Sequence, residues 1–393
     1  SHFICNMRIS WYYYEKLWRK EKTCKICGSK SITISETLGV CGDCFKKYPE
    51  KALNIAMKAH ASSRIKFGLP NEIPNDINGA KCRICANECS IPNGGLGFCG
   101  LVKNTNGLIR YRIKIPEEGI LEWYYDPHPT NCVAWWFCPG STGLGYPKYA
   151  VRNNVEKGYV NLAVFYGTCN MDCLFCQNWF YRENIQNLQP RTPVSELINH
   201  ITHYVTCVCF FGGDPSPQIL HALNVCKTIK EKTKKEKRII RICWETNGLM
   251  NKMFLDLALK FSLESGGIMK FDLKAWNPTL YKGLCGVDGR TVYDNFKHAS
   301  KLIKDRPEIP LLTASTLLIP GYIDEDEIRN IARFIANIDP QIPYSLLAFH
   351  PEYMLIDLPP TSKNHAERCI KAAKDEGLKN IHLGNPWILS NYY

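Results

Sequence analysis

The chain has 393 residues, of which 45% are hydrophobic and 22% are charged. This composition is typical of a globular protein with one large core and smaller attached modules, and it excludes a disordered chain. No run approaches the roughly 18 consecutive apolar residues of a membrane-spanning helix, and the first residues lack the apolar run of a signal peptide. We therefore expect a cytoplasmic protein with no membrane partner.

The formal net charge is +12 at pH 7, and much of this excess is local. Residues 227–238 (KTIKEKTKKEKR) carry a dense run of lysines, which is best interpreted as the solvated face of a helix. Basic residues interleaved with aromatic ones, as in many nucleic-acid-binding surfaces, are not found. We expect no nucleic-acid partner.

The first 157 residues are rich in Cys, Gly, Pro and aromatic residues and show little periodicity, except for a helical pattern over 46–67. We divide them into one module over 1–79 and a second over 80–157. The chain has 20 cysteines, and they fall in short pairs and triplets. In a chain of this size, such spacing favours metal ligation over disulfides.

Two sets of four cysteines stand in these modules. Two CxxC pairs in the first module form a tetrahedral S₄ cage for zinc or a rubredoxin-like iron, which would help to fold a module with little core of its own. The second set lies in the Gly-rich segment 81–100 and predicts another metal, either a single ion or a cluster; the alternative is four unliganded thiols. The two sets are Cys24, Cys27, Cys41 and Cys44, and Cys82, Cys85, Cys89 and Cys99.

From about residue 159 onward, apolar β-branched runs alternate with amphipathic stretches, which is typical of βα units that build a parallel sheet. We expect helices over 216–235 and 324–337, and the second of these begins with acidic residues that suit a helix N-terminus. The fold class is α/β, a partial (β/α)6-type barrel with its core over 158–310 and a late barrel and C-terminal region over 311–393. The expected strands are 159–167, 204–213, 238–247, 266–275, 311–321 and 344–353.

Directly after the first of these strands, residues 167–181 (GTCNMDCLFCQNWFY) place Cys169, Cys173 and Cys176 at CxxxCxxC spacing. A [4Fe–4S] cluster has four irons, so three thiolates leave one iron open to an exogenous ligand. A zinc site or simple packing is the alternative. The triplet resembles the motif of the radical S-adenosylmethionine superfamily. That resemblance implies that the open iron chelates S-adenosylmethionine, whose reductive cleavage yields methionine and a 5′-deoxyadenosyl radical.

Other segments resemble the same superfamily in the same order. Phe175 stands where its members often place an aromatic residue beside the adenine. Residues 211–217 (FGGDPSP) resemble its glycine-rich segment, which implies that Gly212, Gly213 and Asp214 receive the methionine ammonium group.

The ends of the later strands add further candidates. Residues 244–248 (WETNG) and 271–275 (FDLKA) offer polar groups for ribose hydroxyls or a carboxylate, although ordinary loop capping competes with this role. Residues 317–325 (LLIPGYIDE) resemble the superfamily's late adenine-contacting segment. The candidates are Glu245, Asn247, Asp272 and Lys274, followed by Ile319 and Gly321.

The order of these motifs over the whole chain resembles the methanogenesis marker protein 10 family. The resemblance implies a cobalamin-dependent radical methyltransferase that adds a methyl group to an sp³ carbon of an arginine side chain. It also implies that the arginine belongs to the catalytic (alpha) subunit of methyl-coenzyme M reductase, and that an external donor supplies electrons.

The cobalt-ligating DxHxxG loop of many cobalamin domains is not found in this sequence. Residues 126–131 (DPHPTN) come near to it, and we interpret His128 as a turn residue, with a cobalt ligand as the minor alternative. The resemblance implies instead an apolar cobalamin surface from residues 311–393, with Leu317 or Leu318 beside cobalt. It also implies a tyrosine that approaches the open iron, for which Tyr111 is the candidate.

Two rival functions remain open. One is a cobalamin-free enzyme that activates a glycyl radical on a partner protein, and the other is a zinc-stapled binding protein without redox chemistry. The cysteines outside the three sets, including Cys132, Cys138, Cys207 and Cys209, are interpreted as small buried hydrophobic residues without a role.

Overall fold

The computed structural model describes residues 14–393. In these residues the central feature is a nine-stranded sheet with the order β15-β14-β13-β12-β11-β10-β8-β7-β9. The strands from β8 to β15 in this order pair in parallel, whereas β7 and β9 pair antiparallel at one edge. The strands are β7 (Glu118–Pro127), β8 (Val160–Tyr166), β9 (Arg191–Pro193), β10 (Val205–Gly212), β11 (Arg241–Thr246), β12 (Met269–Asp272), β13 (Leu312–Leu318), β14 (Tyr344–Ala348) and β15 (Ile381–Gly384).

The six strands predicted from the sequence are confirmed, with bounds trimmed by up to five residues at their ends. The structure adds β15 at one edge and β7 and β9 at the other, so the sheet is broader than the six-stranded prediction. Its two edge strands, β15 and β9, do not pair with each other in the described part of the chain, and the sheet is therefore open. Because β12 pairs with β13, the segments 158–310 and 311–393 build one continuous sheet.

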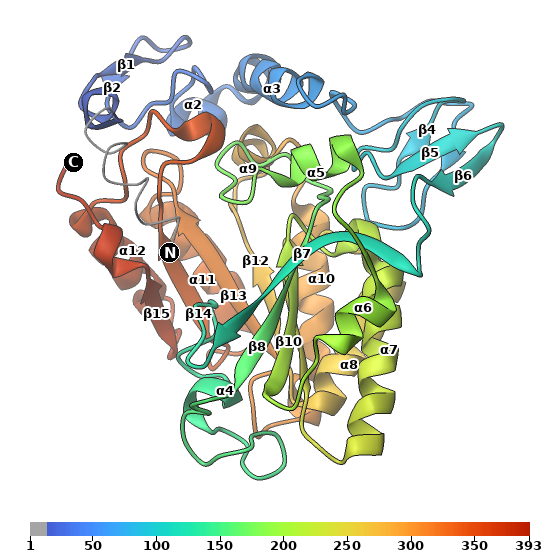
Figure 1. Ribbon diagram of the computed structural model, residues 1–393. Coiled ribbons are helices and arrows are strands. Elements are labelled where there is room, and N and C mark those ends of the chain that lie inside the picture. Colours follow the sequence, from blue (N-terminus) through green and yellow to red (C-terminus); the bar gives the residue numbers. More distant parts are fainter. Residues whose placement is uncertain (1–13) are drawn as a thin grey trace.

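Helices follow the strands and cover the outer face of the sheet (Figure 1). Local signals fix their ends: Asp324 accepts a hydrogen bond from the Glu327 amide at 2.9 Å and caps α11, as the acidic start of that segment predicts. Within residues 14–393, no helix is both long enough and apolar enough to cross a membrane. The helices are α4 (Pro139–Thr142), α5 (Tyr181–Asn187), α6 (Val194–Asn199), α7 (Ile219–Glu236), α8 (Lys252–Ser265), α9 (Pro278–Cys285), α10 (Arg290–Ala299), α11 (Glu325–Ile338) and α12 (Lys363–Asp375), with 3-10 turns η1 (Ser216–Gln218), η2 (Ser300–Asp305), η3 (Tyr353–Leu355) and η4 (Pro386–Ile388).

The N-terminal module contains β1 (Lys22–Thr23), β2 (Lys30–Ser31), α2 (Gly42–Lys47) and α3 (Pro49–Ile65), and it lies at the end of the sheet where the parallel strands terminate (Figure 1). The sulfur atoms of its four cysteines all lie within 4.8 Å of one another. The Cys24–Cys44 and Cys27–Cys41 sulfur distances are 3.7 and 3.8 Å. A tetrahedral ion with metal–sulfur bonds of about 2.3 Å needs sulfur–sulfur edges of about 3.8 Å, so these thiols fit a single zinc or iron ion.

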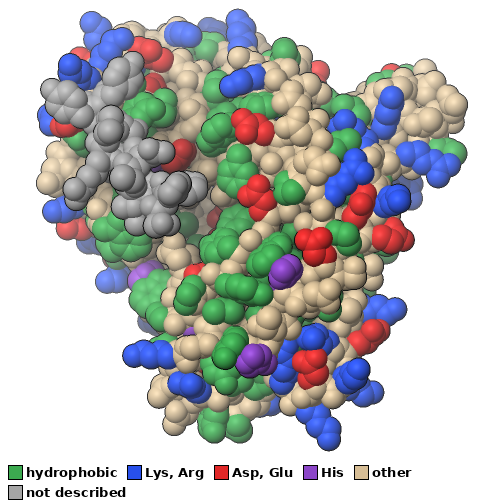
Figure 2. Space-filling view, in the orientation of Figure 1, with side chains coloured by type: hydrophobic (Ala, Val, Ile, Leu, Met, Phe, Trp, Pro, Cys, Tyr) green, Lys and Arg blue, Asp and Glu red, His purple; other side chains and the backbone are tan. Residues whose placement is uncertain are grey.

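The second module contains β3 (Ala80–Lys81), β4 (Ser90–Ile91), β5 (Val102–Thr105) and β6 (Leu108–Tyr111), and it also supplies the edge strand β7 to the main sheet. Figure 2 shows Lys and Arg side chains spread around the rim of one face of the molecule, with hydrophobic side chains across its middle.

Candidate functional site

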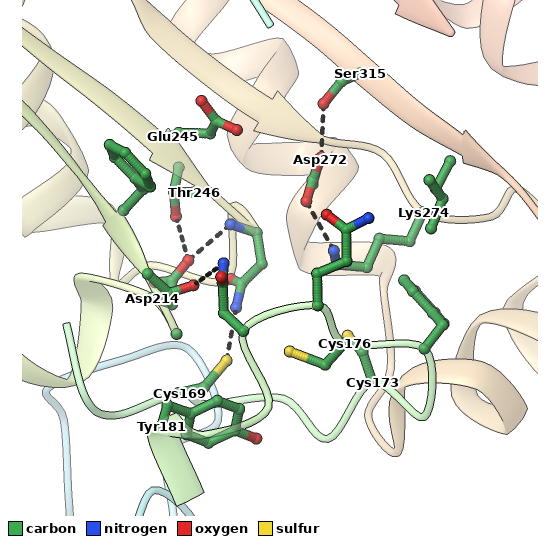
Figure 3. Close-up of a pocket in the computed structure, with 18 of the residues that line it drawn as sticks. Cys169, Cys173, Cys176, Tyr181, Asp214, Glu245, Thr246, Asp272, Lys274 and Ser315 are labelled. Carbon is green, nitrogen blue, oxygen red and sulfur yellow. Dashed lines mark hydrogen bonds and ion pairs between the residues drawn. The ribbon is translucent and has the colours of Figure 1, made fainter. Parts of the chain in front are cut away.

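A cavity of about 1000 Å³ opens at the carboxyl ends of the parallel strands. This is the end where loops carry the functional groups of α/β barrels, because side chains from several neighbouring strands converge there. Eleven residues predicted to bind the cluster or S-adenosylmethionine line it together (Figure 3). They are Cys169, Cys173, Phe175, Cys176, Gly212, Gly213, Asp214, Glu245, Asn247, Asp272 and Lys274.

The three cysteines lie on the loop between β8 and α5 and face this cavity (Figure 3). Cys169 and Cys173 are buried, and Cys176 is partly exposed. A fourth thiol, that of Cys285 at the end of α9, forms a hydrogen bond with Cys173 that lowers the pKa of Cys173 to about 7. Cys285 is fully buried and does not line the cavity, so the cavity itself offers three thiols. This donor set fits a [4Fe–4S] cluster with one open iron.

Asp172 anchors the cysteine loop from within. Its carboxylate accepts hydrogen bonds from the Arg182 guanidinium at 2.7 Å and from the Ser63 hydroxyl at 3.0 Å, and it lies 2.9 Å from Nδ1 of His60. Burial alone would raise the pKa of this carboxyl, but the contact with His60 and the charges of Arg182 and Arg64 hold it well below its usual range. Helix α3 of the N-terminal module therefore fixes the loop that carries the cluster ligands.

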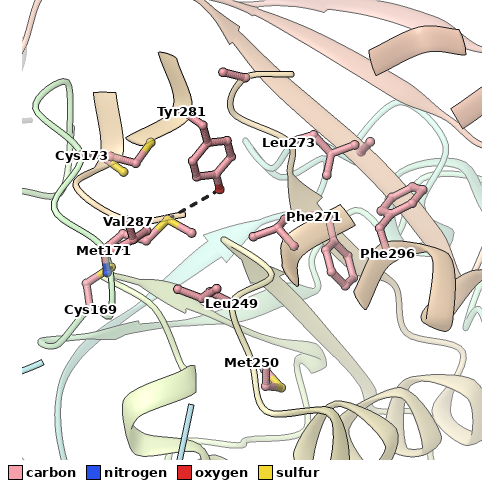
Figure 4. Packing of buried hydrophobic residues seen from close by; sticks show 14 of the residues in the cluster. Cys169, Met171, Cys173, Leu249, Met250, Phe271, Leu273, Tyr281, Val287 and Phe296 are labelled. Carbon is pink, nitrogen blue, oxygen red and sulfur yellow. Dashed lines mark hydrogen bonds between the residues drawn. The ribbon is translucent and has the colours of Figure 1, made fainter. Parts of the chain in front are cut away.

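The other side of the loop packs into the core (Figure 4). Met171, between two of the cysteines, is fully buried near Leu249, Val287 and Tyr281. Its sulfur lies 3.8 Å from the Tyr281 hydroxyl. Burying a Met side chain contributes about 1.5–3 kcal/mol, so the residues between the ligands help to hold the loop in place.

The glycine turn after β10 is in close contact with the start of the cysteine loop. A Cβ on Gly213 would come within 2.2 Å of the Thr168 carbonyl oxygen, and one on Gly212, whose φ is +109°, within 2.3 Å of the Tyr166 amide nitrogen. The Asp214 amide donates to the same Thr168 carbonyl at 2.7 Å. These two glycines are therefore required by the approach of two backbones, because any side chain would push the loops apart.

Asp214 has a different role from the one implied by the resemblance. One of its oxygens accepts hydrogen bonds from the Ser216 amide and hydroxyl, and the other accepts from the Thr246 hydroxyl at 2.8 Å and the Asn247 amide at 2.7 Å. Four donors use the acceptor capacity of a carboxylate. Asp214 therefore ties the end of β10 to the end of β11, and it has no free lone pair for an ammonium group.

Asn247 connects the same strand end to the cysteine loop. Its side-chain amide donates to Oδ1 of the Asn170 side chain at 2.8 Å and lies 3.7 Å from the Cys169 sulfur. Because the amide touches a sulfur ligand and the residue next to it, Asn247 orients the first cysteine of the triplet.

Charged groups line the opposite wall. The Lys274 ammonium contacts the Asp272 carboxylate at 2.8 Å, which also accepts from the Ser315 hydroxyl at 2.6 Å. Glu245 has no hydrogen bond to another described residue. Burial, then the charge of Asp272, raises the pKa of Glu245 to about 6, against the opposing effect of two lysines. The wall thus holds one neutralised ion pair and one free carboxylate.

Several predicted residues lie away from the cavity. Leu317 lines it, but Leu318 and Ile319 do not, because both are buried in the hydrophobic core. Gly321 packs against the N-terminal module, where a Cβ would meet the Thr33 carbonyl oxygen at 2.3 Å. Tyr111 also lies outside, since its buried hydroxyl, which has no hydrogen-bond partner among residues 14–393, faces the second cysteine set.

Some lining residues were not predicted, because each is a common side chain with no motif of its own. Asn178 is the one that the sequence could have indicated, because it follows the cysteine triplet closely. In the structure its side chain donates to the Gly212 carbonyl at 3.1 Å. The unpredicted residues are Gln177, Asn178, Tyr181, Phe211, Thr246, Ser315, Thr316 and Leu347.

The second cysteine set lies directly beside the cysteine loop. Cys82, Cys85 and Cys89 are buried, and Cys99 is partly buried. Asn87, within this set, donates to the Asn170 carbonyl at 2.8 Å, next to Cys169. Among the described Cys, His, Asp and Glu residues, the first set is the one whose ligand atoms all lie within 4.8 Å, so the second set is a wider arrangement.

The sequence is similar to those of known proteins over most of its length. Residues 163–335 match the radical SAM superfamily. The chain is 27% identical over 313 residues to uncharacterized protein MJ0808 of Methanocaldococcus jannaschii, which covers 79% of this chain and 82% of that protein. It is 26% identical over 231 residues to uncharacterized protein MJ0674 of the same organism, covering 56% of this chain and 63% of that protein.

Two solved structures resemble parts of the chain. A domain of pyruvate-formate lyase-activating enzyme from Bacteroides vulgatus is 22% identical, with a TM-score of 0.35, and the match covers 45% of this chain and 98% of that structure. Streptococcus suis SuiB bound to precursor peptide SuiA is 15% identical, with a TM-score of 0.42, covering 55% of this chain and 46% of SuiB. The family match coincides with the strands and loops that build the cavity. Residues 163–335 thus match the radical SAM superfamily at the strands and loops that build the cavity, and a four-cysteine module lies on their N-terminal side.

Proposed function

We propose that this enzyme reductively cleaves S-adenosylmethionine at a cluster held by Cys169, Cys173 and Cys176, and then abstracts hydrogen from an arginine side chain of a protein substrate. The observation that carries the first part is the convergence of three thiols and eight other predicted residues on one cavity. When bound there, the cluster supplies the electron that breaks the carbon–sulfur bond.

Different residues of the cavity would bind different groups of S-adenosylmethionine. The backbone of the turn at Gly212 and Gly213 lies beside the cysteine loop and can accept the methionine ammonium group, since Asp214 is fully occupied. Asp272, which contacts Lys274 and Ser315, would accept hydrogen bonds from ribose hydroxyl groups. Phe175 lies 5.6 Å from the Lys274 ammonium and offers an aromatic face to the adenine.

The arginine would be recognised by Glu245. A guanidinium group in a largely enclosed site needs a carboxylate partner, and Glu245 is the lining carboxylate without a hydrogen bond to another described residue. Its pKa of about 6 means that it is mainly ionised at neutral pH. This supports a cationic substrate in the same cavity.

The methyl-transfer step rests on the order of the sequence motifs. We propose that residues 311–393 would hold cobalamin, which when bound would supply the arginine carbon radical with a methyl group taken from a second S-adenosylmethionine, and that the substrate is the alpha subunit of methyl-coenzyme M reductase. Leu317 and Leu347 line the cavity and supply apolar surface on that side. An external one-electron donor is required to reduce the cluster. His128 is buried and hydrogen-bonds to Thr206, so it is not assigned to cobalt.

The test is anaerobic turnover of reconstituted protein with S-adenosylmethionine, a strong reductant and an arginine-containing peptide, with and without cobalamin. We expect 5′-deoxyadenosine in both cases, and a peptide heavier by one methylene when cobalamin is present. Deoxyadenosine without methylation would contradict the methyl-transfer step, and a glycyl radical formed on a partner protein would favour the cobalamin-free activating enzyme. Zinc without sulfide in the triplet would contradict the radical chemistry itself.

A further inference from the structure

A second, smaller cavity lies inside the sheet toward the amino ends of the strands, away from the radical site. Five cysteines and one lysine line it. Cys207 and Cys209 lie on β10 and Cys243 on β11, while Cys132 and Cys138 come from the segment that leads into α4 and lies across this end (Figure 1). We call this cavity the thiol chamber.

The three strand cysteines share one face of the sheet. Residues two apart on a strand are about 6.6 Å apart, and Cys209 pairs directly with Cys243 on the neighbouring strand. The Cys207 and Cys243 sulfur atoms are 3.5 Å apart. The register therefore brings three thiols to one spot, and Cys132 faces them from the covering segment.

A buried positive charge, that of Lys270, lies in the chamber and has no ion-pair partner within residues 14–393. Lys270 is 2% exposed, and among the described residues its hydrogen bond is to the Cys209 sulfur at 3.1 Å. Glu245 is its neighbour in register on β11, but no ion pair within 4 Å connects the two. Arg241, also in the chamber wall, is neutralised by Glu156 through contacts of 2.9 and 2.7 Å.

An isolated ammonium in an apolar interior costs several kcal/mol, so such groups are paired in folded proteins. Here the nearest group is the Cys209 thiol, so a negative group bound among these thiols would offset the charge.

Two further polar atoms point to a missing occupant. Nδ1 of His128 and Oδ1 of Asn161 are buried, have no hydrogen-bond partner in the described residues, and belong to side chains that line the chamber. Buried polar atoms in folded proteins are nearly always satisfied, and unsatisfied ones often mark an ion or group that binds there. Simple packing of cysteines as small hydrophobic residues explains neither these atoms nor the lysine.

We infer that the thiol chamber binds an iron–sulfur cluster through Cys132, Cys207, Cys209 and Cys243. Cys138 is left out because its thiol is engaged with the Ser141 hydroxyl at 3.4 Å. A thiolate-ligated cluster carries net negative charge, which the Lys270 ammonium offsets.

The thiol chamber and the radical site are neighbouring cavities along the same strands. Along β10, Cys209 is followed two residues later by Phe211, and along β11 Cys243 is followed by Glu245; both of the later residues line the radical cavity. A substrate held at Glu245 would therefore lie between two clusters. This inference does not depend on methyl transfer.

The experiment uses the full chain with the radical triplet replaced (Cys169→Ala/Cys173→Ala/Cys176→Ala), reconstituted anaerobically with iron and sulfide. Adding Cys209→Ser and Cys243→Ser should remove a fixed increment of iron and an equal increment of sulfide, together with one electron paramagnetic resonance signal of the reduced protein. The matched control is Cys226→Ser, a buried cysteine of α7 outside both cavities, which should change none of these. Unchanged iron, sulfide and signals in the double variant, or loss of zinc in place of iron, would overturn the inference.

A second variant keeps the test valid if the double substitution impairs folding. Lys270→Met leaves every thiol in place and removes the positive charge beside the cluster. The reduction potential of one signal should shift to more negative values, since reduction adds negative charge, while the other signals stay unchanged. Identical potentials in Lys270→Met and the parent protein would contradict the assignment.

Discussion

Replacement of Asp172 by Asn isolates the contribution of the buried charge that anchors the cysteine loop. The side chains of Asp172 and Arg182 are both fully buried, with 0% exposure, and the substitution keeps the shape while removing the negative charge. Breaking one partner of a buried ion pair costs about 3–5 kcal/mol, because the other charge is left uncompensated. This is a large part of the about 5–15 kcal/mol by which proteins of ordinary stability resist unfolding.

Urea denaturation followed by circular dichroism measures this cost, and Asp288→Asn is the matched control. Asp288 pairs with Arg290 at 2.6 Å, but the two side chains are 47% and 82% exposed, so its loss should cost less than about 1 kcal/mol. If Asp172→Asn unfolds at the same urea concentration as the control, the anchoring role is wrong.

The pH dependence supplies an independent check on the same residue. The pKa of Asp172 is lowered from its ordinary value of 3.8, so its stabilisation is fully present above that pH and is lost as the pH falls through the pKa in the folded state. The stability difference between Asp172→Asn and the parent protein should therefore shrink under strongly acidic conditions. A difference that grows on acidification would contradict the charge-based explanation.

Three more outcomes are expected. Cys285→Ser should leave the iron content and deoxyadenosine formation near the parent values, because Cys285 does not line the cavity; loss of both would make it a fourth cluster ligand. Gly213→Ala should lower deoxyadenosine formation at least tenfold and destabilise the fold by about 1–3 kcal/mol, since the added Cβ meets a backbone oxygen at 2.2 Å; parent-like turnover would show that the turn can yield. Methylation of the peptide by the parent enzyme should rise as pH increases through about 6, when Glu245 ionises, and Glu245→Gln should remove that inflection in a pH profile; an unchanged profile would separate Glu245 from substrate binding.

The sequence was sufficient for the parts of the site that are local in the chain. Three cysteines at CxxxCxxC spacing and the glycine turn one βα unit later were placed in one cavity, because the carboxyl ends of neighbouring parallel strands meet. The strand β15, in contrast, has four residues and only two of them are Ile or Leu, too short a pattern to predict.

Contacts between distant segments could not be predicted in this way. The hydrogen bond between His60 and Asp172 spans 112 residues, and no periodicity indicates that α3 reaches the cysteine loop. Asp214 matched a motif, yet its oxygens are used by Thr246 and Asn247, which depends on how β10 and β11 lie in space. The thiol chamber was missed for the same reason, since its cysteines come from three separate segments.

The most direct test of the account is the yield of 5′-deoxyadenosine from S-adenosylmethionine under strongly reducing, anaerobic conditions. The reconstituted parent protein and the control variant Cys369→Ser, a buried cysteine of α12, should both form it, and Cys176→Ala should form none above background. Equal deoxyadenosine formation by Cys176→Ala and the parent protein would contradict the claim that this cysteine loop holds the catalytic cluster.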